Sequence, residues 1–283
     1  MGTRLQADDV NINDIRSHHT ELQNMGRQYA DLAIDAGLAT AGALPPPFGT
    51  AADVASLGRS LWRGDWGGAL LDAVGLIPVV GDAAKGGRIA NRLNNLRRSI
   101  DAATTVVSRG FRQTRETALR YWDDMVQANR QRWRDALRNC NGTQACRDAA
   151  ALQKGPQYSN TPSSRNGTWN PPDGRGDGVF TPNNGGPPIT YHNGFPDYSG
   201  HSIADVDIPM TGNRNTDRRL SDAAMRSRDP DWERPDGYVW HHNEDGVTMQ
   251  LVPDSIHGTG RGAQSSHMGG AALYGNGSQA QAF

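Results

Sequence analysis

Three histidines lie within seventeen positions near the C-terminal end of the chain, on either side of a polar turn. They are His241, His242 and His257, in the stretch VWHHNEDGVTMQLVPDSIHGTG, and the 283-residue chain has only eight histidines in all. Neutral imidazole is a common ligand for zinc, copper, iron and nickel, and its near-neutral pKa lets a ring accept a proton from water. The pattern therefore predicts a metal site with a general base beside it. The alternative is a polar hairpin with incidental histidines.

The surrounding residues predict how these histidines are positioned. Residues 238–242 and 247–252 are expected to be paired strands, because the tetrapeptide NEDG between them has the composition of a hairpin turn. Pro253 suits the first position of a helix, and Asp254 favours the positive end of its dipole. Adjacent side chains on a strand face opposite ways. One histidine of the HH pair can thus face a metal with His257 while the other faces a substrate.

The string WHHNEDGVTMQLVP, followed by IH and then HMGG, resembles the WHH branch of the HNH endonuclease superfamily, the ββα-metal or His-Me finger nucleases. The upstream segments FPDYS and MTGNRNTD resemble that branch's lead-in, and the resemblance covers residues 195–273. It implies that His241 and His257 are metal ligands and that His242 is the general base.

One position departs from many relatives, whose last ligand lies one helical turn beyond the equivalent of His257. This chain has Arg261 there, among glycines that disfavour a longer helix. His267 in HMGG is the remaining candidate, either as the third ligand or as a phosphate contact. Arg261 is the second expected catalytic residue, as a cation that steadies the transition-state phosphate.

The resemblance also implies a cofactor and a function. One divalent metal ion, Zn²⁺, Mg²⁺ or similar, is expected to polarise the scissile phosphate while His242 activates water, which leaves a 5′ phosphate. Such domains commonly form the C-terminal toxins of polymorphic bacterial toxins and type VI secretion effectors. The run LWRGDWGGALLDAVGLIPVVGDAAKGG is similar to their pre-toxin segments. The expected protein is an antibacterial DNase; the alternatives are an RNase of the same fold and a non-enzymatic zinc-stabilised binding module.

Partners and localisation follow from the same resemblance. The expected partners are DNA, a cognate immunity protein, and a secretion-spike component or chaperone. We expect synthesis in the producer cytoplasm without a signal peptide, since the start of the chain has no apolar run. Secretion and action in the cytoplasm of a target bacterium would follow. The most apolar run, residues 67–84, is too short to span a bilayer and contains Asp72 and Pro78.

The expected fold class is α+β, with a mainly helical N-terminal region and a small C-terminal ββα-metal nuclease domain. Apolar residues that step by three and four from Leu93 to Val107 predict a helical core, and Gly110 is interpreted as a break or joint in the helix. In residues 155–188, 25 of 34 residues are Gly, Pro, Ser, Thr or Asn, which predicts a linker. The expected regions are 1–84 (helical, pre-toxin-like), 85–154 (basic long helices), 155–188 (linker), 189–274 (nuclease) and 275–283 (disordered tail).

Charge is unevenly distributed, although the formal net charge is only −1. Residues 85–147 carry a net charge of +9, whereas residues 166–283 carry −6. The basic block could track a phosphate backbone or could be a solvated helix face.

The sequence also gives predictions for several individual residues outside the histidine set. Cys140 and Cys146 could form a disulfide or remain two reduced thiols. His192 and His201 are expected at the surface. The remaining predictions are that Trp240 is buried beneath the hairpin, and that Asp197 and Asp217 brace the fold or orient a ligand histidine.

Overall fold

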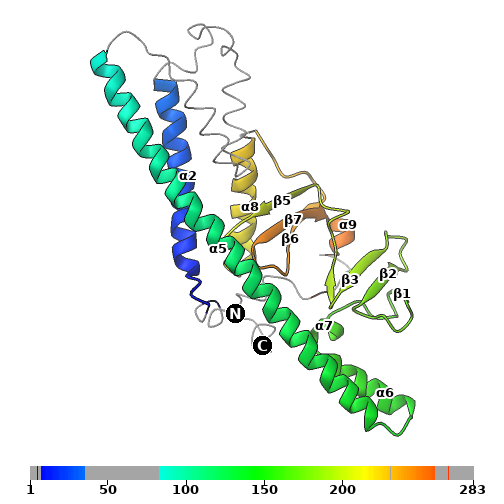
Figure 1. The fold of residues 1–283 in the computed structure, drawn as a ribbon. Helices are drawn as coiled ribbons and strands as arrows, with labels where there is room; N and C mark the ends of the chain where they lie inside the picture. Colours follow the sequence, from blue (N-terminus) through cyan, green and yellow to red (C-terminus); the bar gives the residue numbers. More distant parts are fainter. Residues whose placement is uncertain (1–4, 6–7, 36–82, 230, 259–266, 268–283) are drawn as a thin grey trace. The chain divides into compact units, whose positions relative to one another are not determined.

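The computed structural model describes residues 5, 8–35, 83–229, 231–258 and 267. The chain divides into two compact units. The first comprises Met1–Val10, Gln113–Asp222 and Arg234–Phe283; the second comprises Asn11–Arg112 and Ala223–Glu233. Helices dominate the N-terminal half and small antiparallel sheets the C-terminal half, so the expected α+β class is confirmed (Figure 1). Most of the pre-toxin-like run, Arg261 and the predicted tail lie outside the described residues.

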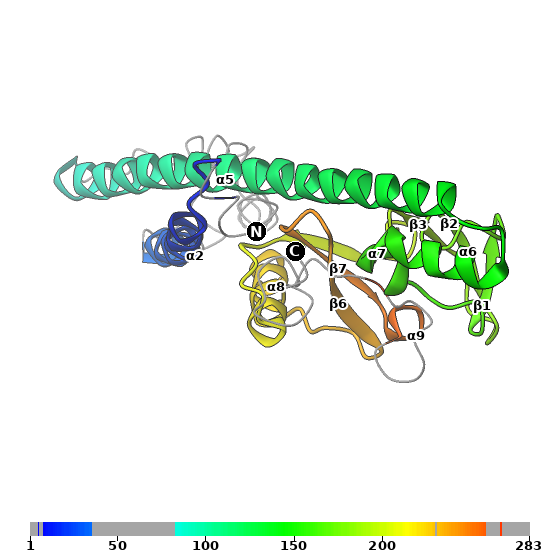
Figure 2. The same ribbon diagram turned by 90° about the horizontal axis from the view of Figure 1, so that it is seen from below.

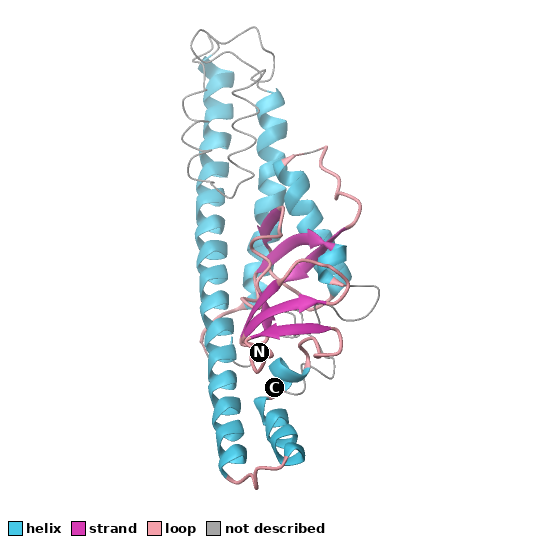
Figure 3. Ribbon diagram, turned by 90° about the vertical axis from the view of Figure 1, so that its right-hand side faces the viewer, coloured by secondary structure: helices cyan, strands magenta, loops and turns pink. Residues whose placement is uncertain are grey.

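The second unit is built on helix α2 (Ile12–Asp35) and the first part of helix α5 (Ala83–Arg138), which lie side by side (Figures 1 and 3). The predicted apolar stripe of α5 is buried against α2, as expected for one face of an amphipathic helix. This core contains Leu22, Met25, Ile100, Ala103 and Val107, with Leu96 and Phe111 packed against it.

Gly110 does not break the helix as its sequence context suggested, because α5 continues through it. A Cβ atom added at Gly110 would lie 2.4 Å from Cγ1 of Ile15, whose side chain is buried. The glycine is needed for the close approach of the α2 side chain and not for a turn. Sequence reasoning missed this because the same residue serves both purposes.

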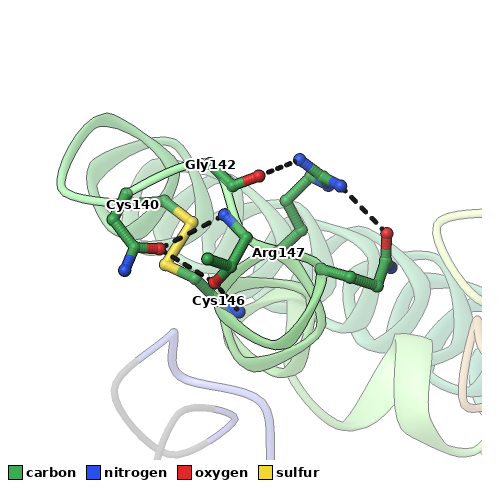
Figure 4. Close-up of a disulfide and its surroundings, with 7 residues drawn as sticks. Cys140, Gly142, Cys146 and Arg147 are labelled. Atoms are coloured by element: carbon green, nitrogen blue, oxygen red, sulfur yellow. Dashed lines mark hydrogen bonds between the residues drawn. A yellow bond between two sulfur atoms is a disulfide. The ribbon is translucent and has the colours of Figure 1, made fainter.

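In the first unit, the end of α5 turns back into α6 (Gln144–Ala151), followed by the short helices η1 (Leu152–Lys154) and α7 (Pro156–Ser159). Cys140 and Cys146 form a disulfide across this turn (Figure 4), which settles the open alternative. Thr143 caps α6 by accepting a hydrogen bond from the Cys146 backbone N–H at 3.3 Å. Arg147 donates to the Gly142 carbonyl in the same turn (Figure 4).

Residues 155–188 are not the linker that their composition predicted. They contain β1 (Gly167–Asn170) and β2 (Gly178–Pro182), which form an antiparallel sheet with β3 (Ile189–His192) and β4 (Phe195–Pro196) in the order β1-β2-β3-β4. The segment has few apolar residues, but the pleat directs them to one face. The resulting core comprises Trp169, Phe180, Ile189, Tyr191, Tyr198 and Val252.

The second sheet carries the histidine pair. Its strand order is β5-β7-β6, with β5 at Ala204–Asp207, β6 at Tyr238–His242 and β7 at Thr248–Pro253. Helix α8 (Arg214–Arg228) precedes the hairpin, and α9 (Asp254–His257) follows it (Figure 2). The hairpin prediction is confirmed, except that Pro253 ends β7 and is the N-cap of α9. Gly258, with φ of 72°, ends α9 after one turn.

Among the described helices, none is long and apolar enough to cross a membrane.

Replacement of Gly110 by alanine is expected to lower the melting temperature. Overpacking against Ile15 costs about 1–3 kcal/mol, which exceeds the roughly 1 kcal/mol that alanine contributes to helix propensity. In an Ile15→Ala background the clash is removed, and Gly110→Ala should then stabilise the protein.

The double-mutant cycle is measured by thermal or urea unfolding. The control is Gly200→Ala, because no described atom lies within 4 Å of the position that a Cβ would take at Gly200. Equal effects of Gly110→Ala in both backgrounds would show that the close approach is unimportant.

Candidate functional site

The β6–β7 hairpin aims the two neighbouring histidines in opposite directions. His241 is paired in register with Gln250, and His242 with Met249, at the end of β6 next to the turn. The turn is tight, because Asp245 Oδ1 accepts hydrogen bonds from the backbone N–H groups of Val247 and Thr248 at 2.9 and 2.8 Å. Strand alternation then directs one ring toward α9 and the other toward α8.

Helix α5 holds this turn from outside the hairpin. Trp122 Nε1 donates to the Glu244 carbonyl at 2.9 Å, and Arg115 Nε donates to Asp245 Oδ2 at 2.8 Å. The same guanidinium reaches Asp207 on β5 at 3.1 Å and Thr248 on β7 at 3.1 Å. One cation therefore ties α5 to both neighbouring strands and to the turn. Burial alone would lower the pKa of Arg115, but the hydrogen bonds and charges of Asp245 and Asp207 raise it.

His241, His257 and His267 converge on one point. One ring nitrogen from each lies within 4.8 Å of the other two. The ring centroids of His241 lie 5.3 Å from His257 and 4.8 Å from His267. The contact from His241 Nδ1 to His257 Nε2 is 3.3 Å. The three residues come from β6, from the end of α9 and from the chain beyond it, as the predicted order required.

This cluster fits a divalent metal ion. Two nitrogens bound to one tetrahedral zinc at about 2.0–2.1 Å lie roughly 3.3 Å apart, which matches the spacing of His241 and His257. His241 is 2% exposed, and its Nε2 has no hydrogen-bond partner among the described residues. The 3.3 Å spacing that fits a shared ion belongs to Nδ1 of His241, so the metal fit rests on that nitrogen and not on Nε2.

The protonation state of the cluster also suits coordination. Burial, and then the neighbouring His267 and His257, lower the pKa of His241 well below its ordinary value. Burial and His267 lower the pKa of His257 to about 3. Both rings are therefore neutral near pH 7, so that each keeps a lone pair for a metal.

Tyr198 packs against all three rings of the cluster. Its ring centroid lies 4.8 Å from His241, 5.8 Å from His257 and 6.0 Å from His267. Tyr198 is fully buried and belongs to the core that also contains Tyr191 of β3 and Val252 of β7. Sequence reasoning included this tyrosine in the FPDYS segment but did not assign it to the site, because nothing in its spacing distinguishes it from core aromatics.

His242 is directed away from the cluster, to α8. Its Nε2 lies 3.1 Å from Oδ2 of Asp217, which is wholly buried in the first turn of α8. Oδ1 of Asp217 accepts hydrogen bonds from Thr211 N at 2.8 Å and Thr211 Oγ1 at 2.6 Å. Burial alone would raise the pKa of Asp217, but the hydrogen bonds from His242 and Thr211 lower it. The carboxylate stays ionised, so it fixes the orientation of the imidazole.

The remaining predicted residues have separate positions. Asp217 contacts His242 and not one of the clustered histidines, and Asp197 Oδ1 accepts from Ser199 N at 2.9 Å within its own loop. His192 is exposed on β3, and His201 is partly buried. Within the part of the chain that the structure describes, neither joins the cluster. Trp240 is buried as predicted, and its indole N–H donates to Asp222 Oδ1 at 2.8 Å.

Comparison with known families agrees with this geometry. Residues 231–277 match the WHH family, described as a nuclease of the HNH/ENDO VII superfamily with conserved WHH. The matched region includes the hairpin, α9 and His267. Residues 231–277 are therefore a WHH-type nuclease domain of the HNH/ENDO VII superfamily, and the three-histidine cluster fits a metal site. No curated protein sequence matches the chain.

His267→Ala is expected to weaken zinc binding by more than about 10-fold, because even the loss of an outer partner of a metal ligand costs that much. Zinc should also raise the melting temperature of the unaltered protein, and a chelator should reverse the rise. Calorimetric titration and thermal unfolding measure the two effects.

The matched control is His192→Ala, which removes an exposed histidine from the same unit. If both variants bind zinc as tightly as the unaltered chain, then His267 is not a ligand and its role as a phosphate contact becomes the one to test.

Proposed function

We propose that the chain is a metal-dependent DNA endonuclease that acts as an antibacterial toxin. The observation that carries the proposal is the pairing of two sites on one hairpin of a WHH domain. His241 belongs to the three-histidine cluster, while the adjacent His242 is paired with the ionised Asp217. A cluster for a cation next to an oriented imidazole is the arrangement needed to hydrolyse a phosphodiester.

His241, His257 and His267 would hold the metal. When bound, a divalent cation supplies Lewis-acid polarisation of the scissile phosphate and charge stabilisation for the leaving 3′ oxygen. The donor set favours zinc or a similar transition metal over Mg²⁺, since imidazole suits the former and oxygen ligands the latter.

His242 is the proposed general base. Donation of its Nε2 proton to Asp217 leaves the lone pair on Nδ1, which can take a proton from the attacking water. The ionised Asp217 then stabilises the imidazolium that forms. Thr211 holds Asp217 through two hydrogen bonds, so the carboxylate cannot rotate away. We propose Arg261, which lies outside the described residues, as the contact to the transition-state phosphate.

DNA as the substrate, rather than RNA, and the toxin role rest on the family resemblance. The proposal includes a cognate immunity protein that protects the producing cell, and a secretion-spike component or chaperone that carries the chain. Action in the cytoplasm of a target bacterium follows from the same proposal.

The test is cleavage of supercoiled plasmid by the purified chain. We expect cleavage that stops with EDTA and returns when Zn²⁺ or another divalent ion is added back. His242→Ala should lose at least about 100-fold in rate, the scale of a lost general base. Gel electrophoresis follows the plasmid, and an end-labelled duplex identifies the 5′ phosphate.

A parallel reaction with a structured RNA separates the two nuclease alternatives, since faster RNA cleavage would replace the DNase assignment. His201→Ala is the control histidine variant. Cytoplasmic expression of the unaltered chain, but not of His242→Ala, should arrest bacterial growth. No cleavage of either nucleic acid with any metal would leave a zinc-stabilised binding module.

Asp217→Asn is expected to slow cleavage by about 10- to 100-fold. In either orientation, the new amide N–H₂ faces a donor. It meets the Thr211 donors, or it meets His242 Nε2 and forces the proton onto Nδ1, where the lone pair is needed. The pH profile of the rate should change together with its magnitude.

Asp222→Asn makes the same substitution on the same helix and serves as the control. Asp222 Oδ1 accepts from the Trp240 indole, and an amide oxygen can do the same. Equal losses of activity in the two variants would mean that Asp217 acts only through stability.

A further inference from the structure

A second polar site lies in the first unit, in a pocket between the end of α5, the short helices η1 and α7, and the loops that follow β1 and β3. Its polar and aromatic lining includes Arg130, Trp133, Lys154, Tyr158, Arg175 and Asp177. Three of these side chains are cations and one is an anion. The pocket therefore has more cations than anions, whereas acidic side chains predominate in residues 166–283 as a whole.

Lys154 is the central cation of the pocket. Its Nζ lies 4.2 Å from the centroid of the Trp133 ring and 4.9 Å from that of Tyr158. Among the described residues, no carboxylate forms an ion pair with this ammonium group. Burial lowers its pKa; Asp177 and Asp173 raise the pKa, and Arg130 and Arg175 lower it, so that the net change is downward. The aromatic rings stabilise the charge, but its hydrogen-bonding capacity is available to a ligand.

Arg175 and Arg130 differ in how many of their hydrogen-bond donors are already used within the protein. Arg175 lies over Tyr158 with its guanidinium carbon 4.7 Å from the ring centroid, and it donates to the Thr161 carbonyl at 2.9 Å. Arg175 is therefore mainly structural. Arg130 is partly exposed, and its Nη2 donates to Asn193 Oδ1 at 2.9 Å and pairs with Asp177 at 3.3 Å.

The single carboxylate that lines the pocket is already engaged. Oδ1 of Asp177 accepts the Asn193 backbone N–H at 2.6 Å, and Oδ2 pairs with Arg130. One anion thus faces three cations, and the pocket carries a local excess of positive charge. An oxyanion with several acceptor atoms would relieve the repulsion between these cations.

The chain itself links this pocket to the histidine cluster. Asn193 and Gly194 line the pocket, and the strand β4 that follows them leads to Tyr198, whose ring packs on His241, His257 and His267. Tyr198 lies four positions after Gly194, and this stretch of backbone can span at most about 14 Å. Phosphates of one DNA strand rise by about 3.4 Å each, so a backbone span of that length corresponds to about four nucleotides.

We propose that this pocket binds a backbone phosphate of the nucleic-acid substrate, a few nucleotides from the scissile bond, with Lys154 and Arg130 as the contacts. The proposal rests on the nuclease function proposed above. Lys154 supplies the unpaired ammonium, and Arg130 supplies guanidinium donors at the open side. The contact gives affinity without base specificity, because a phosphate is the same at every position.

The experiment measures binding of a labelled DNA duplex by fluorescence anisotropy over a range of salt concentrations. All variants are made in the His242→Ala background, so that cleavage does not interfere. Lys154→Met keeps the apolar stem against Trp133 and removes the charge. We expect about 3- to 10-fold weaker binding near 0.1 M salt, and a slope of log affinity against log salt that is smaller by about one.

Arg134→Met is the matched control, since it removes one charge from an exposed position on α5 that contacts Gln131 outside the pocket. Lys154→Arg should keep the salt slope. If Lys154→Met and Arg134→Met have the same affinity and slope, the pocket does not bind the substrate. If Lys154→Met lowers the melting temperature, Arg130→Gln is measured in its place. A slope of log affinity against log salt that is unchanged in Arg130→Gln would then overturn the proposal.

The proposed function can fail separately from this inference. A chain that binds duplex through Lys154 but cleaves neither DNA nor RNA would keep the phosphate pocket and overturn the nuclease assignment.

Discussion

The ion pair between Arg115 and Asp245 is the interaction on which the site depends. Asp245 is almost fully buried in the hairpin turn, where its other oxygen caps two backbone N–H groups. A buried carboxylate without a cation would be strongly destabilising, so the turn requires the helix that supplies Arg115. His241 and His242 immediately precede this turn, and a rotated turn would redirect both rings. The supporting segment lies more than a hundred residues before the matched region 231–277, so the site is built from more of the chain than that region.

The local features of the site could be predicted from the sequence, because short-range rules determine them. The NEDG turn, the alternation of side chains along β6 and the glycine after His257 placed His241 with His257 and turned His242 away. The prediction that residues 155–188 form a linker was wrong because it used composition and not the positions of individual residues. Composition averages over a segment, whereas β1 and β2 need only Trp169 and Phe180 to face the same core. These two aromatic rings join a core completed by residues outside the segment, and the pairing of β1 with β2 adds backbone hydrogen bonds, so a segment rich in glycine and proline is ordered.

The long-range pairings could not be predicted, since residue type alone does not identify a partner. Asp217 and Asp222 are both acidic residues of α8, five positions apart, yet one orients His242 and the other accepts a hydrogen bond from Trp240. The partners of the basic residues within 85–147 could not be predicted for the same reason. Their positive charge suggested a phosphate-tracking surface or a solvated face, but Arg115, Arg120 and Arg130 pair with carboxylates of the first unit. Arg115 and Arg120 therefore contribute to the fold, which neither interpretation had included, while Arg130 both pairs with Asp177 and lines the proposed phosphate pocket.

Because of these pairings, the acidic residues within 166–283 repel an anionic substrate less than their net charge suggests. Several of their carboxylates are engaged within the fold, with Asp207 and Asp245 on Arg115, Asp177 on Arg130, and Asp217 on His242 and Thr211. The neighbouring cations and hydrogen-bond donors partly cancel the electric fields of these carboxylates at short range. At 0.1 M salt, the remaining field is screened beyond about 10 Å. A bound strand responds to the charges within that distance rather than to the net charge of the domain. Under the proposal that the Lys154 pocket binds a substrate phosphate, local groups matter more than the net charge, and in this pocket the cations outnumber the single lining carboxylate.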